Sequence, residues 1–580
     1  MTSPLGTNGN EAMSPMEFMA RIRSAAQSND LAGAMRIADQ ARNTHPSDAS
    51  LADALGTLAL KLGDAEKAVA QFGAACTLAP QTLDYALNRS IALQRLERHA
   101  DAIALLEKHE TVGRSVARYG SIRALSHRAL GQPAEAAHWY DAALSLEPGH
   151  ALSLHGRARV AIERGEEDAV ARFDAALAVN QGEADLWLGK AQALDVAGDG
   201  AGALAIAEQL STQAPGFIAA HSFLAGLRLA AGESDFAAPF RNAGLKAPQD
   251  PNIAATHAET LAGLDFAAEA ADVAADARAR FPNEPHFTLL EAVHSGSAGD
   301  LTRAEAVFAQ LPSGTPRRAV HEARHRIRTG EFDRADGLLE EALADEPWDI
   351  TAWSLRGIVW RLLDGETAKA NAAWLHEQDG LIQFRPLVAR SDLLDDATEH
   401  LRVLHAGSAM PLGQSLRGGT QTRGVLFHRT EAILSELHDA IVATLEEYRA
   451  DLPKMDKTHP MLRLRDEPWR LAGSWSVRLT GGGDHHTAHI HPQGMISSAL
   501  YLVVPDASSQ QVGGKDRQGW LEIGRPKSDL GLNLEPLASI QPKPGHLALF
   551  PSTAYHGTTP FASGKTAASE RMTVAFDVVS

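Results

Sequence analysis

SLADALGTLALKLGDAEKAVAQFGAACTLAP (residues 50–80) is the stretch that decides the fold of the N-terminal part of the chain. Gly56 lies in a first amphipathic segment, Gly63 marks a turn, Phe72 lies in a second segment, and Pro80 closes the stretch. Small residues let two helices cross closely, and a glycine punctuates the connection between them. The stretch therefore predicts a pair of packed helices.

The turn signal recurs along the chain, mostly at steps of about one or two units of 34 residues. The positions are Asn29-Asp30, Gly63-Asp64, Gly131-Gln132, Gly165-Glu166, Gly198-Asp199, Gly232-Glu233, Gly299-Asp300, Gly330-Glu331 and Gly365-Glu366. This pattern resembles the tetratricopeptide repeat over residues 15–378, in about ten units that degrade after Gly232. Stacked units form an all-α superhelix with a concave groove, which we expect to bind a protein or peptide. Self-association or a spacer role is the alternative.

The composition limits the classes of partner and the cellular compartment that we expect for this protein. The 580 residues carry a net charge of −18, which argues against a nucleic-acid backbone or an anionic membrane as the main partner. The single cysteine, Cys76, excludes an intramolecular disulfide framework and cysteine-based zinc ribbons. Neither a secretory apolar segment nor a membrane span is recognisable, so we expect a cytoplasmic protein.

Beyond about residue 380 the hydrophobic pattern changes. Residues 428–453 read as one amphipathic helix whose apolar stripe, from Ile433 to Tyr448, we expect to be core contact. After this helix the period becomes two, which is typical of strands. The expected strands are GSWSVRL (473–479), ISSALYLVVP (496–505), GWLEIGRP (519–526), GHLALFPS (545–552) and RMTVAFDVV (571–579). Several short strands at this spacing predict a sandwich or barrel.

Histidines gather in GGGDHHTAHIHPQG (481–494), just before the second expected strand. On a strand, residues two apart share a face, so His489 and His491 can converge on one metal ion. His556, at the end of LALFPSTAYHG, is the expected third ligand. We interpret His485 and His486 as bystanders at the rim of the pocket.

An anion site is predicted on the last strand. Arg571 and Thr573 share one strand face. A fixed guanidinium grips a carboxylate with two N–H groups, and a neighbouring hydroxyl adds a further donor.

Together these pieces resemble the iron(II)- and 2-oxoglutarate-dependent oxygenases, and more narrowly a bacterial and phage branch of that superfamily. The residues that carry the resemblance are HIHPQGMISSALYLVVP (489–505), LALFPSTAYHG (547–557) and RMTVAF (571–576). The stretch QSLRGGTQT (414–422) is similar to the start of the same domain. The resemblance implies a double-stranded β-helix, or jelly roll, over about residues 400–580.

The resemblance also implies cofactors and roles. Fe(II) is expected on His489, His491 and His556, and the far carboxylate of 2-oxoglutarate on Arg571 and Thr573. Hydroxylation of a substrate by O2 is then coupled to the conversion of 2-oxoglutarate to succinate and CO2. Trp475 and Tyr501 are expected to line the substrate pocket, and no catalytic side chain is predicted beyond the metal centre.

One coordination position remains open, because the usual set is two histidines and one carboxylate, with the carboxylate where His491 stands. In the first interpretation His491 is itself a ligand. In the second the carboxylate comes from elsewhere, with Asp484 as the reserve ligand. In the third His491 lines the pocket and a water takes the position. Strand geometry favours the first.

Three functions follow from these alternatives. The first is a 2-oxoglutarate oxygenase that hydroxylates a protein or peptide recruited by the repeats. The second is a three-histidine dioxygenase similar to cupins, which needs no 2-oxoglutarate and in which Arg571 holds a substrate carboxylate. The third is a non-catalytic interaction scaffold. The expected organisation is a disordered N-terminus (1–14), the repeat superhelix (15–378), a connector (379–410) and the jelly-roll domain (411–580).

Overall fold

A computed structural model describes residues 13–312, 315, 317–408, 415–480, 484–505, 517–561 and 570–580. The chain divides into two compact units, residues 1–186 and 187–580. Most of the expected disordered N-terminus lies outside the described residues, as do Gly481–Gly483 and the start of QSLRGGTQT. Ser14 caps the first helix through a capping box with Glu17, which fixes where the regular structure begins.

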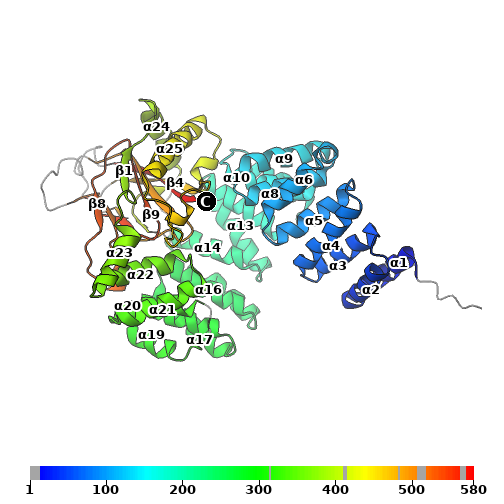
Figure 1. Cartoon of the computed structure of the whole chain (residues 1–580), viewed down its shortest axis with the longest axis horizontal. Coiled ribbons are helices and arrows are strands. Elements are labelled where there is room, and N and C mark those ends of the chain that lie inside the picture. The colour runs from blue at the N-terminus through cyan, green and yellow to red at the C-terminus, as the bar shows by residue number, and fades with distance from the viewer. Residues whose placement is uncertain are drawn as a thin grey trace, which may run out of the picture. The chain divides into compact units, whose positions relative to one another are not determined.

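Helices in consecutive pairs make up the first unit (Figure 1). Small buried residues form the crossings, as at Gly56, where an added Cβ would come within 2.8 Å of the Phe72 ring. The expected pair in residues 50–80 is therefore present. The helices are α1 (Pro15–Gln27), α2 (Leu31–Thr44), α3 (Ala49–Lys61), α4 (Ala65–Leu78), α5 (Leu83–Arg95), α6 (His99–Glu107), α7 (Glu110–Gly113), α8 (Ala117–Ala129), α9 (Pro133–Leu146), α10 (Ala151–Glu163), α11 (Ala169–Val179) and the start of α12 (Ala184–Val196).

Helix pairs continue through the N-terminal part of the second unit. The helices that follow α12 are α13 (Gly200–Gln213), α14 (Ile218–Ala230), α15 (Ala238–Lys246), α16 (Pro251–Gly263), α17 (Ala267–Arg280), α18 (Pro285–Ser297), α19 (Leu301–Phe308), α20 (Arg318–Thr329), α21 (Phe332–Asp345), α22 (Ile350–Leu362) and α23 (Glu366–His376). The repeats whose sequence pattern degrades after Gly232 thus still fold as paired helices.

The turn inside each pair contains a residue with positive φ. The expected turn residues have this conformation, from Asn29 (φ 62°) to Gly365 (φ 127°). The double steps in the sequence pattern are explained by Glu97 (φ 58°) and Asp265 (φ 71°), which adopt the same conformation without being glycine. Single units therefore occupy the places where the sequence showed a gap.

The C-terminal part consists of antiparallel sheets and two long helices, consistent with a jelly roll. Six strands form the main sheet in the order β1 (Gln383–Pro386), β9 (His546–Pro551), β6 (Ile496–Val503), β11 (Arg571–Val579), β4 (Arg470–Leu479) and β3 (Thr420–Gln421). The smaller sheets are β10 (His556–Thr558), β7 (Leu521–Ile523) and β8 (Ala538–Ile540), and β2 (Leu416–Arg417) with β5 (His485–His486).

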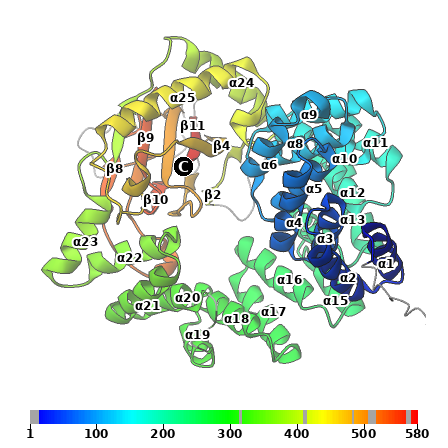
Figure 2. The same ribbon diagram turned by 45° about the vertical axis from the view of Figure 1, so that its right-hand side comes forward.

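The two faces of the main sheet have different partners. One face packs against α24 (Leu393–Ala406) and α25 (Ala432–Asp451), which lie over it in Figure 2. On β11 the even-numbered side chains, from Met572 to Val578, belong to this core. The stripe predicted on α25 packs there too, with Ile433 partly buried and Leu437, Ile441, Leu445 and Tyr448 buried. Alternation along the strand leaves the odd-numbered residues, from Arg571 onward, for the opposite face.

The last repeat helices share a core with loops of the sheet domain. Buried side chains of α20 to α23 form one cluster with Leu530 and Tyr555, and Ile490 packs against it. Polar contacts reinforce this junction: the Arg328 guanidinium lies 2.8 Å from an Asp529 carboxylate oxygen. Buried side chains within residues 320–375 thus form part of the core on which Ile490 of the histidine segment packs. None of the described helices combines the length and apolar character needed to cross a bilayer.

Replacing Glu97 by glycine should stabilise the first unit by about 1 kcal/mol, because a left-handed backbone costs a residue with a Cβ roughly that much. Glu97 is highly exposed, and an exposed carboxylate gains little from its ion pair with His99, so little is lost with its side chain. The measurement is the urea midpoint of the purified protein.

The matched control is Gly63→Glu, at the equivalent turn, where an added Cβ would meet nothing within 4 Å. It should destabilise by a similar amount. Equal stability of Glu97→Gly and the parent would contradict the assignment of strain to this turn.

Candidate metal centre

The backbone brings two histidines from distant segments opposite each other. His489 and His556 form an isolated antiparallel bridge, in which the His489 N–H donates to the His556 carbonyl (3.0 Å) and the His556 N–H donates to that of His489 (2.9 Å). The expectation that His489 and His491 lie on a regular strand is therefore wrong. Pro492 follows His491, and a turn closes at once with the Gly494 N–H donating to the His491 carbonyl. The extended segment is too short for a ladder, yet residues two apart still face one side.

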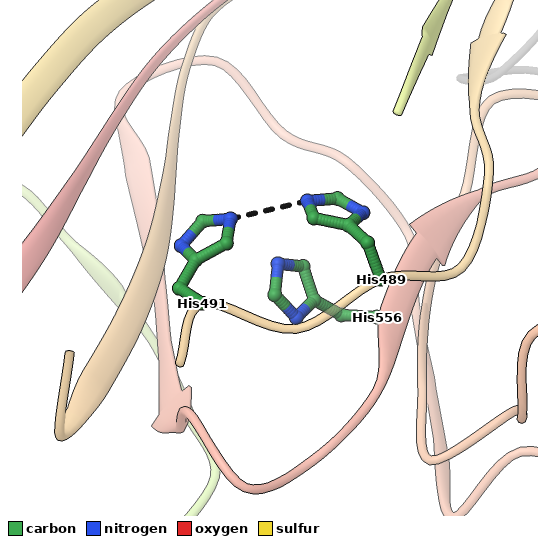
Figure 3. A group of neighbouring side chains, drawn as sticks. All are labelled: His489, His491 and His556. Atoms are coloured by element: carbon green, nitrogen blue, oxygen red, sulfur yellow. Dashed lines mark hydrogen bonds between the residues drawn. The ribbon is translucent and has the colours of Figure 1, made fainter. Parts of the chain in front are cut away.

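The side chains of His489, His491 and His556 converge (Figure 3). One ring nitrogen of each lies within 4.8 Å of the corresponding nitrogen of the others. The Nε2 atoms of His489 and His491 are 3.1 Å apart. Two ligand nitrogens bound at about 2.1 Å and at right angles around a metal ion would be about 3 Å apart. The arrangement therefore has the dimensions of a metal site.

The outer nitrogen of each ring has an oxygen partner. Nδ1 of His489 lies 2.8 Å from the Thr487 carbonyl, and Nδ1 of His556 lies 3.2 Å from the Ala554 carbonyl. Nδ1 of His491 lies 2.5 Å from the Asp577 carboxylate. Because these oxygens accept hydrogen bonds, each Nδ1 carries the proton and each Nε2 keeps its lone pair. With neutral rings, lone pairs face one another across 3.1 Å, an arrangement that a bound cation stabilises.

Burial keeps the rings in the form that binds metal. It lowers the pKa of His489 to about 3, and the neighbouring His491 acts in the same direction. Burial also holds the pKa of His556 well below the ordinary value for histidine. Neutral imidazole is the ligand form, so these two side chains are ready to coordinate at neutral pH.

The remaining polar residues of the motif lie outside the three-histidine group. An Asp484 carboxylate oxygen accepts a hydrogen bond from the Thr480 N–H (3.1 Å) and packs against Gly418. His486 stacks beside His489 with ring centroids 5.8 Å apart, and it contacts Ser415. Within the described part of the chain, the histidines at 489, 491 and 556 are the group with mutually close ligand atoms. The reserve ligand Asp484 and the two expected bystanders are not among them.

Arg571 lies on the sheet face expected from its position in the strand. Thr573 of β11 pairs with Val477 of β4 and with Tyr501 of β6, so these side chains share that face. Arg571 is 3% exposed, and its Cζ lies 5.3 Å from the centre of the Tyr501 ring. Burial raises the pKa of the Tyr501 hydroxyl, and the guanidinium opposes this.

Two buried polar atoms at this position fit a carboxylate ligand. Nε of Arg571 and the hydroxyl of Tyr501 have no hydrogen-bond partner among the residues that the structure describes. A buried donor without a partner is costly, so a site with two of them is suited to an anion with oxygen acceptors. The fourth residue expected here, Trp475, packs edge-on against His491 with ring centroids 5.4 Å apart.

Two contributors were not predicted from the sequence. Asp577 holds His491, although it lies four residues after Thr573 on the odd-numbered face of the same strand. Strand parity alone could have indicated it. Ile490 points away from the two histidines that flank it and packs on the core of the last repeats. The sequence does not predict that Ile490 packs against these helices, because the contact joins distant parts of the chain.

Comparisons with known protein families agree with an N-terminal repeat region followed by a C-terminal β domain. Residues 473–577 match the family described as "Putative 2OG-Fe(II) oxygenase". Residues 54–114 and 167–216 match the tetratricopeptide repeat family. No curated protein is significantly similar to the chain.

Solved structures similar to the chain include tetratricopeptide repeat proteins. A tetratricopeptide repeat protein from Parabacteroides merdae is 19% identical, with a TM-score of 0.37, over 43% of this chain and 98% of its own. PilW, a type IV pilus biogenesis factor, is 17% identical, with a TM-score of 0.33, over 35% of this chain and 94% of its own. A thermophilic repeat protein from Thermus thermophilus is 21% identical, with a TM-score of 0.28, over 31% and 99%. The chain thus joins an N-terminal tetratricopeptide repeat region to a C-terminal domain of the 2OG-Fe(II) oxygenase type.

Proposed function

We propose that the protein is an Fe(II)- and 2-oxoglutarate-dependent oxygenase that hydroxylates a protein or peptide bound by its repeats. The observation that carries the proposal is the group of three histidines with every Nδ1 held by an oxygen and the other ring nitrogens converging. The match of residues 473–577 to the oxygenase family supports the same chemistry. The buried Arg571 and Tyr501 atoms without partners among the described residues support a dicarboxylate cosubstrate.

Each residue of the site has a role in this proposal. His489, His491 and His556 hold the iron, and Arg571 with Thr573 holds the far carboxylate of 2-oxoglutarate. When bound, iron and 2-oxoglutarate supply the activation of O2, with succinate and CO2 as the products of the cosubstrate. Trp475 and Tyr501 form the wall of the pocket beside His491 and Arg571. The buried Tyr501 ring and the partly buried Trp475 ring limit access of water to the reacting atoms.

A second candidate function is favoured by the ligand set itself. Within the described residues no carboxylate joins the three histidines, a set that resembles that of cupin-type dioxygenases. Such an enzyme needs no 2-oxoglutarate, and Arg571 would then hold a carboxylate of the substrate. Dependence of turnover on 2-oxoglutarate separates the two candidates.

A groove in the first unit is the proposed docking place for the partner. It has a volume of 890 Å³ and runs along α5, α8 and α10. Leu125 and Leu152 are 42% and 71% exposed on its wall. Four arginines line it, against two carboxylates, in a chain whose net charge is −18. Three of the arginines are in ion pairs, Arg118 with Asp84, Arg128 with Glu163 and Arg159 with Asp185. This lining suits a peptide segment with leucine-like and acidic side chains.

The first prediction of this proposal concerns the metal and the cosubstrate. The wild-type protein should bind Fe(II) anaerobically and release succinate from 2-oxoglutarate in air. His556→Ala should lose both, because it removes a ligand. Arg571→Ala should keep the metal and raise the KM for 2-oxoglutarate about 10- to 100-fold, since hydrogen bonds to a charged group are lost.

The control for this experiment is His485→Ala, a histidine of the same segment outside the three-histidine group. Loss of metal binding on replacing Arg571 would contradict its role as the anion site. Turnover of a substrate without 2-oxoglutarate would favour the second candidate.

The second prediction concerns the groove. On an array of immobilised peptides, the full-length protein should prefer peptides with leucine and glutamate over otherwise identical peptides with lysine. Arg118→Glu should weaken this binding about tenfold, as expected for a lost charged hydrogen bond. Arg36→Glu, an exposed arginine of α2 outside the groove, is the matched control. Equal weakening by both would mean that net charge rather than the groove selects the peptide.

The third prediction concerns the shared core. Trp360 of α22 is 5% exposed in the cluster on which Ile490 and Tyr555 pack. Trp360→Ala should destabilise the second unit by about 3–5 kcal/mol and also weaken metal binding, because the ligand segments lose their support. Phe173→Ala in α11, fully buried in the first unit, should cost a similar amount and leave the metal affinity unchanged. An unchanged metal affinity in Trp360→Ala would show that the junction does not support the site.

A further inference from the structure

A carboxylate contacts one of the three histidines on the side of its ring that faces away from the proposed metal position. Asp577 contacts Nδ1 of His491 at 2.5 Å, on the ring edge opposite the nitrogen that faces His489. In the usual oxygenase set a carboxylate occupies the position of His491 and binds the metal directly. Here the negative charge is present, but an imidazole separates it from the place where the metal would be held.

We infer that Asp577 is a positioning residue that orients His491 and supplies, through its ring, the negative charge that a carboxylate ligand would provide. This inference rests on the proposed metal centre. A carboxylate accepts a hydrogen bond and cannot donate one, so the His491 proton stays on Nδ1 and the Nε2 lone pair faces the metal site. The hydrogen bond also raises the electron density on the ring and hence the donor strength of Nε2.

Charge balance is the second argument. Three neutral imidazoles leave both charges of a divalent ion uncompensated in a buried site, where electrostatic interactions are strong. Asp577 adds one negative charge with a side chain only 17% exposed. Among the described residues it is the carboxylate in contact with the three-histidine group, because Asp484 accepts from the Thr480 N–H instead. The three histidines together with Asp577 thus carry the same net charge, −1, as the usual set of two histidines and one carboxylate, although no carboxylate is a ligand.

The surrounding strands hold this pair in place. Asp577 of β11 pairs in register with Ser497 of β6, whose hydroxyl lies 3.3 Å from Nδ1 of His491 and 2.9 Å from the Ser552 hydroxyl. Gly494 closes the turn after His491, and a Cβ there would come within 3.2 Å of the Asp577 side chain. A side chain at position 494 would therefore crowd Asp577 and Ser552.

The test is a titration of the full-length protein with Co(II), a visible-absorbing substitute for iron, followed by anaerobic Fe(II). Asp577→Asn keeps the shape of the side chain and removes its charge. It should weaken metal binding about 10- to 100-fold and shift the Co(II) absorption bands, because the donor strength of His491 falls. Adding His491→Asp to this variant should restore binding to within a few-fold of wild type, because the carboxylate now coordinates directly.

The matched control is Asp484→Asn, which removes a carboxylate of the same histidine-rich segment and should leave the affinity and the spectrum unchanged. Wild-type affinity and an unshifted spectrum in Asp577→Asn would overturn the inference. Should that variant not fold, as judged by thermal melting without metal, the same titration of Asp577→Ser decides in the same way. Absence of metal binding by the wild type would instead overturn the metal centre itself.

Discussion

Two backbone hydrogen bonds between His489 and His556 are the constraint on which the site depends. They bring together two segments that are separated in the sequence by β6 to β9, and they place the two rings with centroids 4.4 Å apart. The local geometry is the same on both sides of the bridge. Each histidine directs Nδ1 to the carbonyl two residues before it, from Thr487 in one segment and Ala554 in the other. Once the bridge forms, two of the three histidines are oriented by the chain that carries them.

Much of this arrangement could be predicted from periodicity. The step of the turn residues indicated the helix pairs, and the change to a period of two indicated the strands that begin near Trp475 and Arg571. Parity within the HIH segment and the last strand placed His489, His491, Arg571 and Thr573 on the correct sides. The roles of these residues stay predictions, because geometry alone does not establish what they bind.

Two kinds of feature were not predicted from the sequence: turns without a glycine, and contacts between residues that are far apart in the chain. A turn residue with positive φ is recognisable when it is glycine, and Glu97 and Asp265 carry no such mark. The HIH segment was expected to be a strand, yet its pairing is limited to one bridge before Pro492. Strand parity places Asp577 on the face of the site, but only the fold shows that its partner there is His491. Local rules predict which way a side chain points, and only the packed chain shows what it meets.

The position of Ile490 has a thermodynamic consequence. Because the two histidines beside it face the site, Ile490 must face the other way, and there it packs on the core shared with α20 to α23. An ion that binds the folded histidine segment and not the unfolded one stabilises everything that unfolds together with that segment. Binding of an ion at the histidine segment would therefore stabilise the last repeats as well. By reciprocity, a ligand that bound and stabilised α20 to α23 would also strengthen the binding of that ion, so these two binding events would be coupled equilibria.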